Sequence, residues 1–326
     1  MEEKKIPDYY TLVSGEHIER VFAVRRFDEK TAKNGKPYLD IVFFDKHNEI
    51  SAKLWDLGEH DVNRLRDCLF MLVRGYVETY NNHLQIRIEG LEEAKPAGEE
   101  LEGLITLAPY PPDRMYAKIV EIIGALPNED LSRLVIAIYS DHESELMYYP
   151  AAKSYHHTTK GGLLHHVYTM LRCASPLCSI YPLIDKSLLY AGIALHDIGK
   201  LAEMESSEYG IVKSYSVEGS LMGHLTSGLV LIDRYGEKLG INQDKLLLLK
   251  HMVLSHHGNA SYGSPKPPMI IEAEMLHYLD VIDSRMNIFE RALSQTKVGE
   301  FSAKEAALDM REIFNHSGNE GEPDAF

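Results

Sequence analysis

One stretch of the sequence, residues 188 to 200, is Leu188-Leu189-Tyr190-Ala191-Gly192-Ile193-Ala194-Leu195-His196-Asp197-Ile198-Gly199-Lys200. Its apolar first part predicts a helix that is buried in a core. His196 and Asp197 follow at once, so a charged pair stands at the buried end of that helix. An unpaired buried carboxylate is costly, and a cation would remove the cost. The stretch therefore predicts a metal site inside a helical domain.

Histidines are concentrated around this pair. Ten of the 16 histidines fall between His156 and His277, and several of them lie on or beside segments with helical periodicity. A helical bundle can direct such side chains at one interior point, where imidazole and carboxylate suit Mn, Fe, Co, Ni or Zn. The periodicity predicts helices over residues 114–126, 128–141, 163–173, 187–196, 221–239, 245–256, 270–289 and 302–314.

The N-terminal part of the chain has a different pattern. Polar and apolar residues alternate over 17–24 and 49–55, and residues 38–44 are rich in β-forming residues. With 69–80 and 84–91, these segments predict five strands. Lys33-Asn34-Gly35-Lys36 and Tyr80-Asn81-Asn82-His83 are typical of hairpin turns. Residues 61–67 predict one helix between the third and fourth strands. Five strands with this interruption predict an OB-type barrel, a module that often binds single-stranded nucleic acid.

The composition changes once, between these two parts. Residues 96–112 are rich in Pro, Gly and Glu, which predicts a linker. We therefore expect a multidomain protein, in which an all-β OB-fold barrel over residues 1–95 is followed by an all-α helical bundle over 113–316. The acidic, Gly-containing end, 317–326, predicts a flexible tail.

The charge of the chain limits its mode of binding. There are 34 basic and 49 acidic residues, giving a net charge of -15, which argues against holding nucleic acid by bulk charge. If the protein binds a polyanion, local basic patches or metal ions must make the contact. The apolar runs are too short to span a membrane and the first residues do not resemble a signal peptide, so we expect a cytoplasmic protein without membrane association. The three cysteines predict reduced, structural thiols.

The segment from Leu195 to Lys200 resembles the signature of HD-domain metal-dependent phosphohydrolases. Further motifs extend the resemblance: Pro150-Ala151-Ala152-Lys153-Ser154-Tyr155-His156-His157, Gly161-Gly162-Leu163-Leu164-His165-His166, Ser255-His256-His257-Gly258 and Leu276-His277-Tyr278-Leu279-Asp280. With Lys33 to Tyr38, Ala52 to Asp56 and Leu84 to Gly90 in the barrel, they are similar to the YhaM-type 3′ to 5′ exoribonucleases of bacteria. The resemblance covers most of residues 11–283.

The resemblance implies a set of metal ligands. It makes His166, His196, Asp197 and Asp280 ligands of one ion, and His224 and His256 ligands of a second, with Asp197 bridging the two. His165 is the alternative to His166, and a buried core histidine is the alternative for His224. His256 and His257 could instead cap a helix. We expect two divalent ions, with manganese first and iron, cobalt, nickel or zinc as alternatives.

Other residues are expected to act around this set. The resemblance places Lys200 near a substrate phosphate, as a catalytic residue with Asp197. His257 and His156 are candidates for a metal or phosphate contact. His277 is expected either to support the metal ligands or to lie in the core, and Asp283 is expected to support the fold. In the barrel, aromatic residues near polar turns and the basic residues beside them are candidates for nucleic-acid binding: Tyr38, Trp55, Tyr80, Lys36, Lys53 and Arg87.

Three functions remain open at this point. The first is a 3′ to 5′ exoribonuclease that hydrolyses single-stranded RNA to 5′-monophosphates with two ions about 3.5 to 4 Å apart, with single-stranded DNA as an alternative substrate. The second is a phosphohydrolase of nucleotides or cyclic dinucleotides. The third is a non-catalytic binder of single strands with a structural metal. The resemblance favours the first, and a homo-oligomer is a further expectation.

Overall fold

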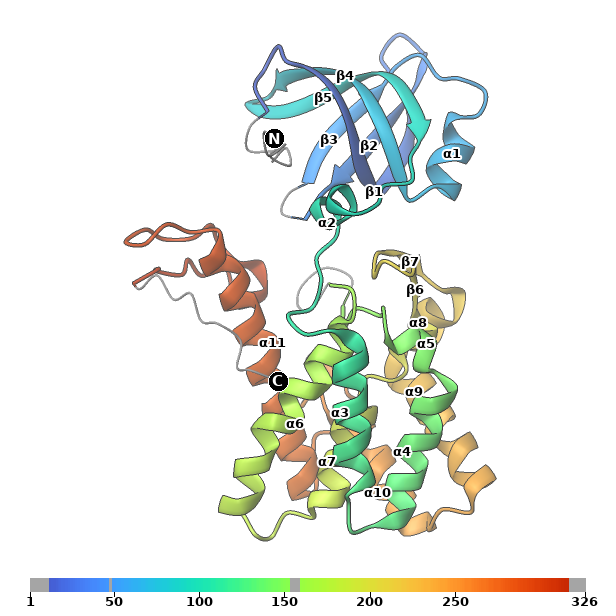
Figure 1. Ribbon diagram of the computed structural model, residues 1–326, viewed down its shortest axis with the longest axis vertical. Helices are drawn as coiled ribbons and strands as arrows, with labels where there is room; N and C mark the ends of the chain where they lie inside the picture. Colours follow the sequence, from blue (N-terminus) through green and yellow to red (C-terminus); the bar gives the residue numbers. More distant parts are fainter. Residues whose placement is uncertain (1–11, 47–48, 153–158, 317–326) are drawn as a thin grey trace. The chain divides into compact units, whose positions relative to one another are not determined.

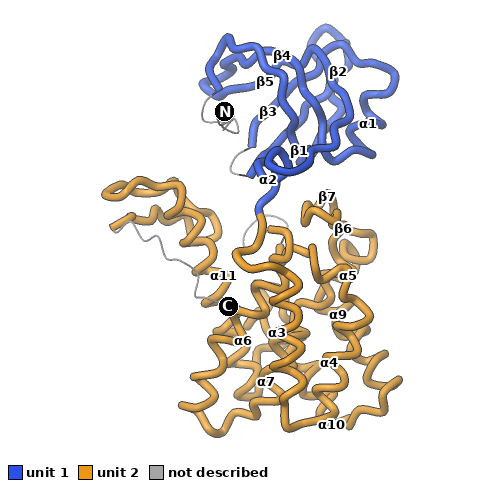
Figure 2. Tube along the Cα trace, viewed as in Figure 1, with its two compact units in different colours: residues 1–106 blue, residues 107–326 orange. Residues whose placement is uncertain are grey.

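The computed structural model describes residues 12–46, 49–152 and 159–316 (Figure 1). The chain forms two compact units, residues 1–106 and 107–326 (Figure 2). The change between them falls inside the segment that the composition marks as a linker. The last part of the first unit contains a short helix, α2 (Glu99–Leu104).

The first unit is a closed five-stranded barrel. Its strands are β1 (His17–Thr31), β2 (Pro37–Phe44), β3 (Glu49–Leu54), β4 (Phe70–Tyr80) and β5 (His83–Glu93), in the order β1-β2-β3-β5-β4. β3 pairs with β5 in parallel, whereas the other pairs are antiparallel. Helix α1 (Asp61–Asp67) lies between β3 and β4 in the sequence. This order and the helix position are those of an OB fold, as predicted.

The barrel interior follows from the alternation in its strands. Leu39, Ile41 and Phe43 on β2 are fully buried, and Ala52 of β3 faces Ile86 of β5 in register. At the β4–β5 turn, Asn81 and Asn82 take left-handed backbone conformations with φ of 48° and 64°, which asparagine tolerates.

The second unit is mostly helical. Its longer helices are α3 (Pro112–Gly124), α4 (Glu129–Asp141), α6 (Gly162–Ile180), α7 (Lys186–Leu195), α9 (Val217–Leu239), α10 (Gln243–Ser255) and α11 (Ile271–Ser294). Helix α7 is buried from Ser187 to Leu195 and packs against α4, α6, α10 and α11. Side-chain oxygens of Asn128, Asp185, Ser216 and Asn242 cap α4, α7, α9 and α10.

Short elements complete this unit. They are α5 (Glu143–Leu146), α8 (Lys200–Glu203), the hairpin β6 (Met204–Ser206) and β7 (Val212–Tyr215), and the 3₁₀ turns η2 (Ala260–Tyr262) and η3 (Ala306–Leu308). The β6–β7 hairpin was not expected from the sequence. In the described part of the chain, no helix is both long and apolar enough to cross a bilayer.

The predicted helix over residues 302–314 is wrong. The chain instead folds back on itself, with antiparallel bridges from Phe301 to Phe314 and from Glu305 to Arg311. Asp309 and Met310, with φ of 59° and 61°, form the reversal. Leu308 and Ile313 are buried against α11 in a small separate cluster. Burial of these two side chains therefore outweighs the helical propensity of the segment.

Candidate metal centre

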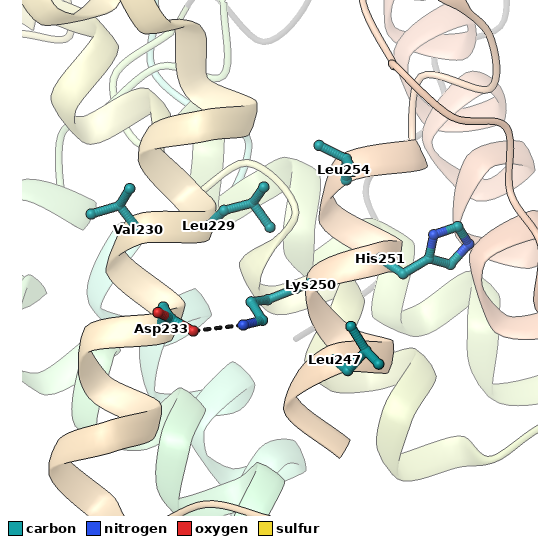
Figure 3. A pocket seen from close by; sticks show the side chains of 7 residues that line it. All are labelled: Leu229, Val230, Asp233, Leu247, Lys250, His251 and Leu254. Atoms are coloured by element: carbon teal, nitrogen blue, oxygen red, sulfur yellow. Dashed lines mark hydrogen bonds and ion pairs between the residues drawn. The ribbon is translucent and has the colours of Figure 1, made fainter. Parts of the chain in front are cut away.

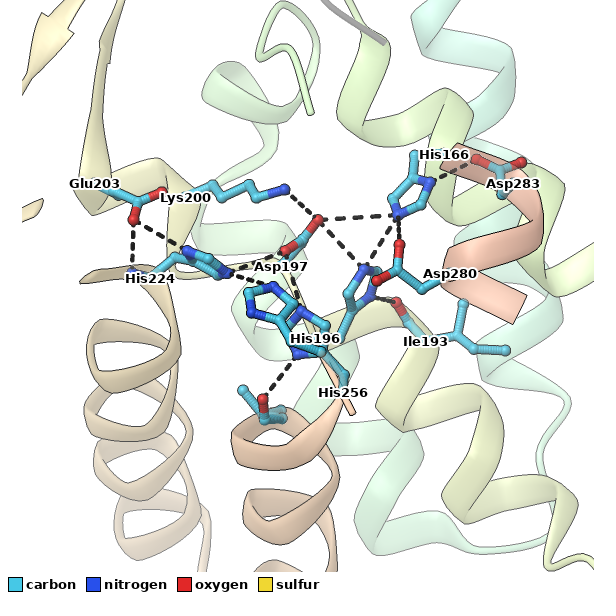
Figure 4. A network of polar contacts seen from close by, with 12 residues as sticks. His166, Ile193, His196, Asp197, Lys200, Glu203, His224, His256, Asp280 and Asp283 are labelled. Carbon is cyan, nitrogen blue, oxygen red and sulfur yellow. Dashed lines mark hydrogen bonds and ion pairs between the residues drawn. The ribbon is translucent and has the colours of Figure 1, made fainter. Parts of the chain in front are cut away.

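The candidate centre lies where the ends of several helices meet, and α7 supplies its middle (Figure 4). His196 follows the last residue of α7, and its Nδ1–H donates to the carbonyl oxygen of Ile193 at 2.8 Å. This hydrogen bond fixes the ring and leaves Nε2 to face the centre. His196 is fully buried, so its free nitrogen needs a partner inside the protein.

His256 repeats this arrangement at the end of α10. Its Nδ1–H donates to the carbonyl oxygen of Val253 at 2.8 Å, and its Nε2 lies 3.7 Å from Oδ1 of Asp197. Burial and repulsion from His196 lower the pKa of His256 well below its ordinary value. A neutral imidazole with a free Nε2 is the form that binds a metal.

His166 of α6 is held by two carboxylates of α11. Its Nδ1–H donates to Oδ2 of Asp283 at 2.6 Å, and its Nε2 lies 3.4 Å from Oδ1 of Asp280. The same Nε2 is 3.2 Å from Nε2 of His196. Burial opposes protonation, but the contacts with Asp280 and Asp283 outweigh it and raise the pKa of His166 to about 10. In the metal-free protein His166 therefore carries a proton that a metal would displace.

Asp197 stands between two groups of histidines. Its Oδ2 lies 3.3 Å from Nε2 of His196 and 3.9 Å from Nε2 of His166, and accepts a hydrogen bond from Lys200 at 2.6 Å. Its Oδ1 is 3.7 Å from Nε2 of both His224 and His256. Burial opposes ionisation, but Lys200 and His196 outweigh it and hold the pKa of Asp197 well below its ordinary value.

His224 belongs to α9 and follows a break in that helix. Gly223 has a φ of 68° and a ψ of 160°, so the helix is interrupted immediately before His224. Oε1 of Glu203 accepts hydrogen bonds from the backbone N–H and from Nδ1–H of His224, both at 3.0 Å. The Nε2 atom of His224 is thereby left for the centre. Burial opposes ionisation of Glu203, but the bond from His224 outweighs it and lowers its pKa.

These residues fit divalent cations. Three groups place all their candidate ligand atoms within 4.8 Å of one another: His166 with His196 and Asp197, His196 with His256 and Asp280, and His224 with His256 and His257. Oδ1 of Asp197 is buried and has no hydrogen-bond partner among the residues that the structure describes. A buried anionic oxygen flanked by imidazole nitrogens is costly without a cation. Nitrogen and carboxylate donors together suit transition-metal dications.

Known proteins are similar to this chain over most of its length. The HD domain family matches residues 163–285. The 3′-5′ exoribonuclease YhaM of Bacillus subtilis (strain 168) is 36% identical over 304 residues, which cover 92% of this chain and 95% of the relative. The chain belongs to the YhaM 3′-5′ exoribonuclease family. The YhaM protein of Listeria innocua serovar 6a is 35% identical over 314 residues, which cover 96% of this chain and 98% of its own.

One solved structure aligns with a smaller part of this YhaM family member. The second OB-fold domain of replication protein A from Methanococcus maripaludis covers 28% of this chain and 98% of its own, with 16% sequence identity and a TM-score of 0.20. The OB assignment of the barrel rests on its strand order and not on this weak alignment.

The structure separates the adjacent histidines of α6. His166 is fully buried in the centre, whereas the half-buried ring of His165 lies 5.9 Å from that of Tyr110. His257 joins the group of His224 and His256, and its Nε2 is 3.4 Å from that of His224. His156 lies outside the described residues.

Two residues contribute more than the sequence suggested. Asp283 was expected to be structural, but it orients His166 directly. Glu203, which the sequence did not single out, orients His224; its position one turn after Lys200 was the available signal. His277 supports the centre as expected, because its Nδ1–H donates to the carbonyl oxygen of His256 at 2.8 Å.

The barrel brings some of the candidate nucleic-acid residues together. The rings of Tyr38 and Trp55 stack with centroids 4.5 Å apart, and Nζ of Lys53 lies 5.0 Å from the Tyr38 centroid. Arg87 is the partner of Lys53 in the β3–β5 register. Lys36 lies in the β1–β2 turn, and Tyr80, which is 60% exposed, lies at the β4–β5 turn.

Two cavities lie beside α9 and α10. One, of about 480 Å³, has walls that include Leu229, Val230 and Leu247 and is crossed by an ion pair of 2.6 Å between Lys250 and Asp233 (Figure 3). No predicted site residue lines it. The other, of about 330 Å³, is lined in part by His224 and His257 and so adjoins the candidate centre.

Proposed function

We propose that this chain is a metal-dependent 3′ to 5′ exoribonuclease that removes nucleotides one at a time from single-stranded RNA as 5′-monophosphates. The observation that carries the proposal is the position of Asp197, whose two oxygens face two different groups of histidines. Family membership supplies the reaction class. Single-stranded DNA is the second substrate to test, and we expect a cytoplasmic protein that forms homo-oligomers.

His166, His196, Asp197 and Asp280 would hold one ion, and His224 and His256 would hold a second, with His257 as a further candidate. Manganese is the expected metal. Divalent ions in such a site supply a nucleophilic water at neutral pH and offset charge on the phosphate. This resolves the conflict between a net charge of -15 and a polyanionic substrate, because the positive charge is concentrated at the reacting phosphate.

The chain's own residues orient the reaction. Asp197 stays ionised under the influence of Lys200 and His196, so it is ready to act as a ligand. The Lys200 ammonium donates one hydrogen bond to Asp197 and retains further N–H donors. We assign these donors to a phosphate oxygen, where they would stabilise the negative charge that grows in the transition state.

In the overall step, water adds to the phosphorus of the last phosphodiester while the bond to the penultimate O3′ breaks. One proton of the water passes to that O3′, and the terminal nucleotide leaves as its 5′-monophosphate. No protein nucleophile is required. The stacked rings of Tyr38 and Trp55 with Lys53 are suited to hold bases and phosphates upstream of the cut.

The experiment compares substrates under identical conditions. The purified protein is stripped of metal, restored with manganese, iron, cobalt, nickel or zinc, and given labelled RNA, labelled single-stranded DNA or a cyclic dinucleotide. We expect 5′-monophosphates from RNA with at least one metal. Hydrolysis of the cyclic dinucleotide alone would identify a nucleotide phosphohydrolase, and binding without hydrolysis would identify a non-catalytic protein.

Lys200→Ala extends the test to the phosphate contact. We expect near-normal metal content and a lower kcat, because the transition-state contact is lost while the metal ligands remain. Lys304→Ala, a change of an exposed lysine outside the centre, is the control. Unchanged kinetics in Lys200→Ala would mean that this ammonium only pairs with Asp197.

A further inference from the structure

The cavity of about 330 Å³ beside the centre has two kinds of wall. His224 and His257 form the side next to the metal ligands, and Met222, Leu254, Tyr262 and Pro265 contribute apolar and aromatic surface. Its volume is at the lower end of the range for small-molecule sites, roughly 300 to 1,000 Å³. It is therefore suited to one nucleotide rather than to a length of strand.

Tyr262 is the aromatic ring that this cavity presents to solvent. Tyr262 is 70% exposed, and it lines the same cavity as the candidate ligands His224 and His257. Met222, on the same wall, is 49% exposed. An exposed aromatic ring and a thioether in one concave site form a surface on which a planar base can stack.

The loop that carries Tyr262 is held by its own hydrogen bonds. Oδ1 of Asn259 accepts from the N–H of Ser261 at 2.9 Å, and the carbonyl oxygen of Asn259 accepts from Tyr262 and Ser264, both at 3.2 Å. Oγ of Ser264 accepts from the N–H of His257 at 3.1 Å. These bonds tie the backbone of the loop that carries Tyr262 to His257.

This cavity and the candidate centre share His224 and His257. Nε2 of His224 is 3.4 Å from Nε2 of His257 and 3.7 Å from Oδ1 of Asp197. A group seated in the cavity is therefore next to the atoms that would hold the scissile phosphate. In a 3′ to 5′ exonuclease, that phosphate leaves with the terminal nucleotide, so the terminal nucleotide is one of the two whose base can lie in this cavity.

Resting on the proposed function, we infer that this cavity binds the 3′-terminal nucleotide and that Tyr262 stacks on its base. The contact is to the face of the base and uses no hydrogen-bonding edge. It would accept all four bases, and it would favour purines because they offer more stacking surface. Tyr262 is a positioning residue for the terminal nucleotide, with Met222 completing the wall.

The test uses two short RNA substrates that differ only at the 3′ end, one with a terminal adenosine and one with a terminal abasic nucleotide. The kcat/KM ratio for these substrates is measured in the metal-loaded full-length protein and in Tyr262→Ala, Tyr262→Phe and Tyr181→Ala. Tyr181, which is 50% exposed at the end of α6, is the matched control. Because the ratio is taken within each variant, a general loss of fold or metal cancels.

In the unaltered protein we expect the terminal base to raise kcat/KM by about 5-fold to 150-fold over the abasic end, the range of one base–aromatic stack. Tyr262→Ala should reduce this ratio most of the way to one, whereas Tyr262→Phe and Tyr181→Ala should retain it. A ratio in Tyr262→Ala equal to that in Tyr181→Ala would overturn the inference and leave the proposed function standing. If the unaltered protein released no nucleotide from either RNA, the proposed function itself would fail.

Discussion

Asp197 determines what the centre can do, because its two oxygens face opposite sides of one cluster. Oδ2 lies near His166 and His196, whereas Oδ1 lies near His224 and His256. A carboxylate so placed can bridge two ions, and Oδ1 has no hydrogen-bond partner among the described residues that would replace an ion. The resemblance predicted this bridging role, which stays a prediction.

Asp197→Asn tests the role with little change in shape. We expect bound metal to fall and RNA hydrolysis to drop by more than about 100-fold, since residues that merely orient ligands already account for 10-fold to 100-fold effects. Metal analysis, hydrolysis rates and helical circular dichroism check this. Asp233→Asn, at an exposed ion pair on α9, is the control. Wild-type activity with a full metal complement in Asp197→Asn would refute the bridge.

Asp283 contributes to the candidate centre through its contact with His166. Loss of its hydrogen bond at 2.6 Å frees the ring and removes one of the two carboxylates beside it. We expect Asp283→Ala to weaken metal binding by about 10-fold to 100-fold. His166→Ala should have a larger effect, and His165→Ala should be close to wild type. Metal titrations rank the three variants, and a larger loss in His165→Ala would move the ligand by one residue.

The protonation of His166 gives metal binding a pH dependence. Its pKa is raised to about 10 in the metal-free fold, against an ordinary value of about 6.5. At pH 7 to 9 a metal must therefore displace one proton, and its apparent affinity should rise about tenfold per pH unit. By the same linkage, the stability that this proton gives the metal-free fold is complete below about pH 6.5 and is lost as pH rises through about 10.

Metal titration in weak buffer at pH 7 and pH 8 counts the released protons. One proton per site and an affinity that rises between the two values would agree with this account. A pH-independent affinity without proton release would show that His166 is neutral in the metal-free protein or is not a ligand.

At the scale of elements, the contact between α8 and α9 positions His224. A side chain added at Gly199 would collide with the carbonyl oxygen of His224 and would lie 2.6 Å from the N–H nitrogen of Gly228. Both of these atoms belong to the backbone, so α8 and α9 would have to move apart to make room for the side chain. The sequence alone assigned Gly199 to the HD-type motif, but it did not reveal this close approach.

Gly199→Ala should therefore shift His224 and reduce both activity and stability, with an overpacking cost of about 1 to 3 kcal/mol. Gly124→Ala is the matched control, because its added carbon would meet only Ile136 at an ordinary 3.9 Å. Thermal unfolding and RNA hydrolysis measure the two variants. Equal stability and equal RNA hydrolysis in the two variants would show that α8 and α9 can move apart without disturbing His224.

The elements also show where sequence reasoning succeeds and fails. Long amphipathic helices and alternating strands were predictable because burial imposes a period on the residues. The fold of residues 302–314 was not predictable. Their side chains are compatible with a helix, but the segment forms a hairpin in which Leu308 and Ile313 are buried. The β6–β7 hairpin is too short to show a period. Similarly, the register that separates His165 from His166 depends on the packing of α6.

At the scale of the whole molecule, the chain combines a barrel with a helical hydrolase unit. The order and type of the two units were predictable because the periodicity of the sequence changes once, from strand-like to helical. The family comparisons agree with this order. The sequence could not show which aromatics of the barrel are core. The structure places Phe43 fully inside, whereas Trp55 is 38% exposed.

Trp55→Ala tests the barrel's part in binding. We expect a KM for long single-stranded RNA that is about 5-fold to 150-fold higher, because one stacked base is lost, with little change in thermal stability since the ring is partly exposed. Hydrolysis of a trinucleotide is the control and should hardly change. Binding of long RNA should also weaken as salt rises. A large fall in the melting temperature would instead make Trp55 part of the barrel core.

Stepwise hydrolysis from the 3′ end is tested most directly by the order in which labelled nucleotides leave a single-stranded RNA. One RNA carries its label at the 5′ end and the other at the 3′ end, and both are followed over time with metal-restored protein. We expect a ladder of progressively shorter 5′-labelled products, and immediate release of the 3′ label as a 5′-monophosphate. Release of the 5′ label as a mononucleotide at the outset, or internal fragments from both RNAs, would contradict stepwise hydrolysis from the 3′ end.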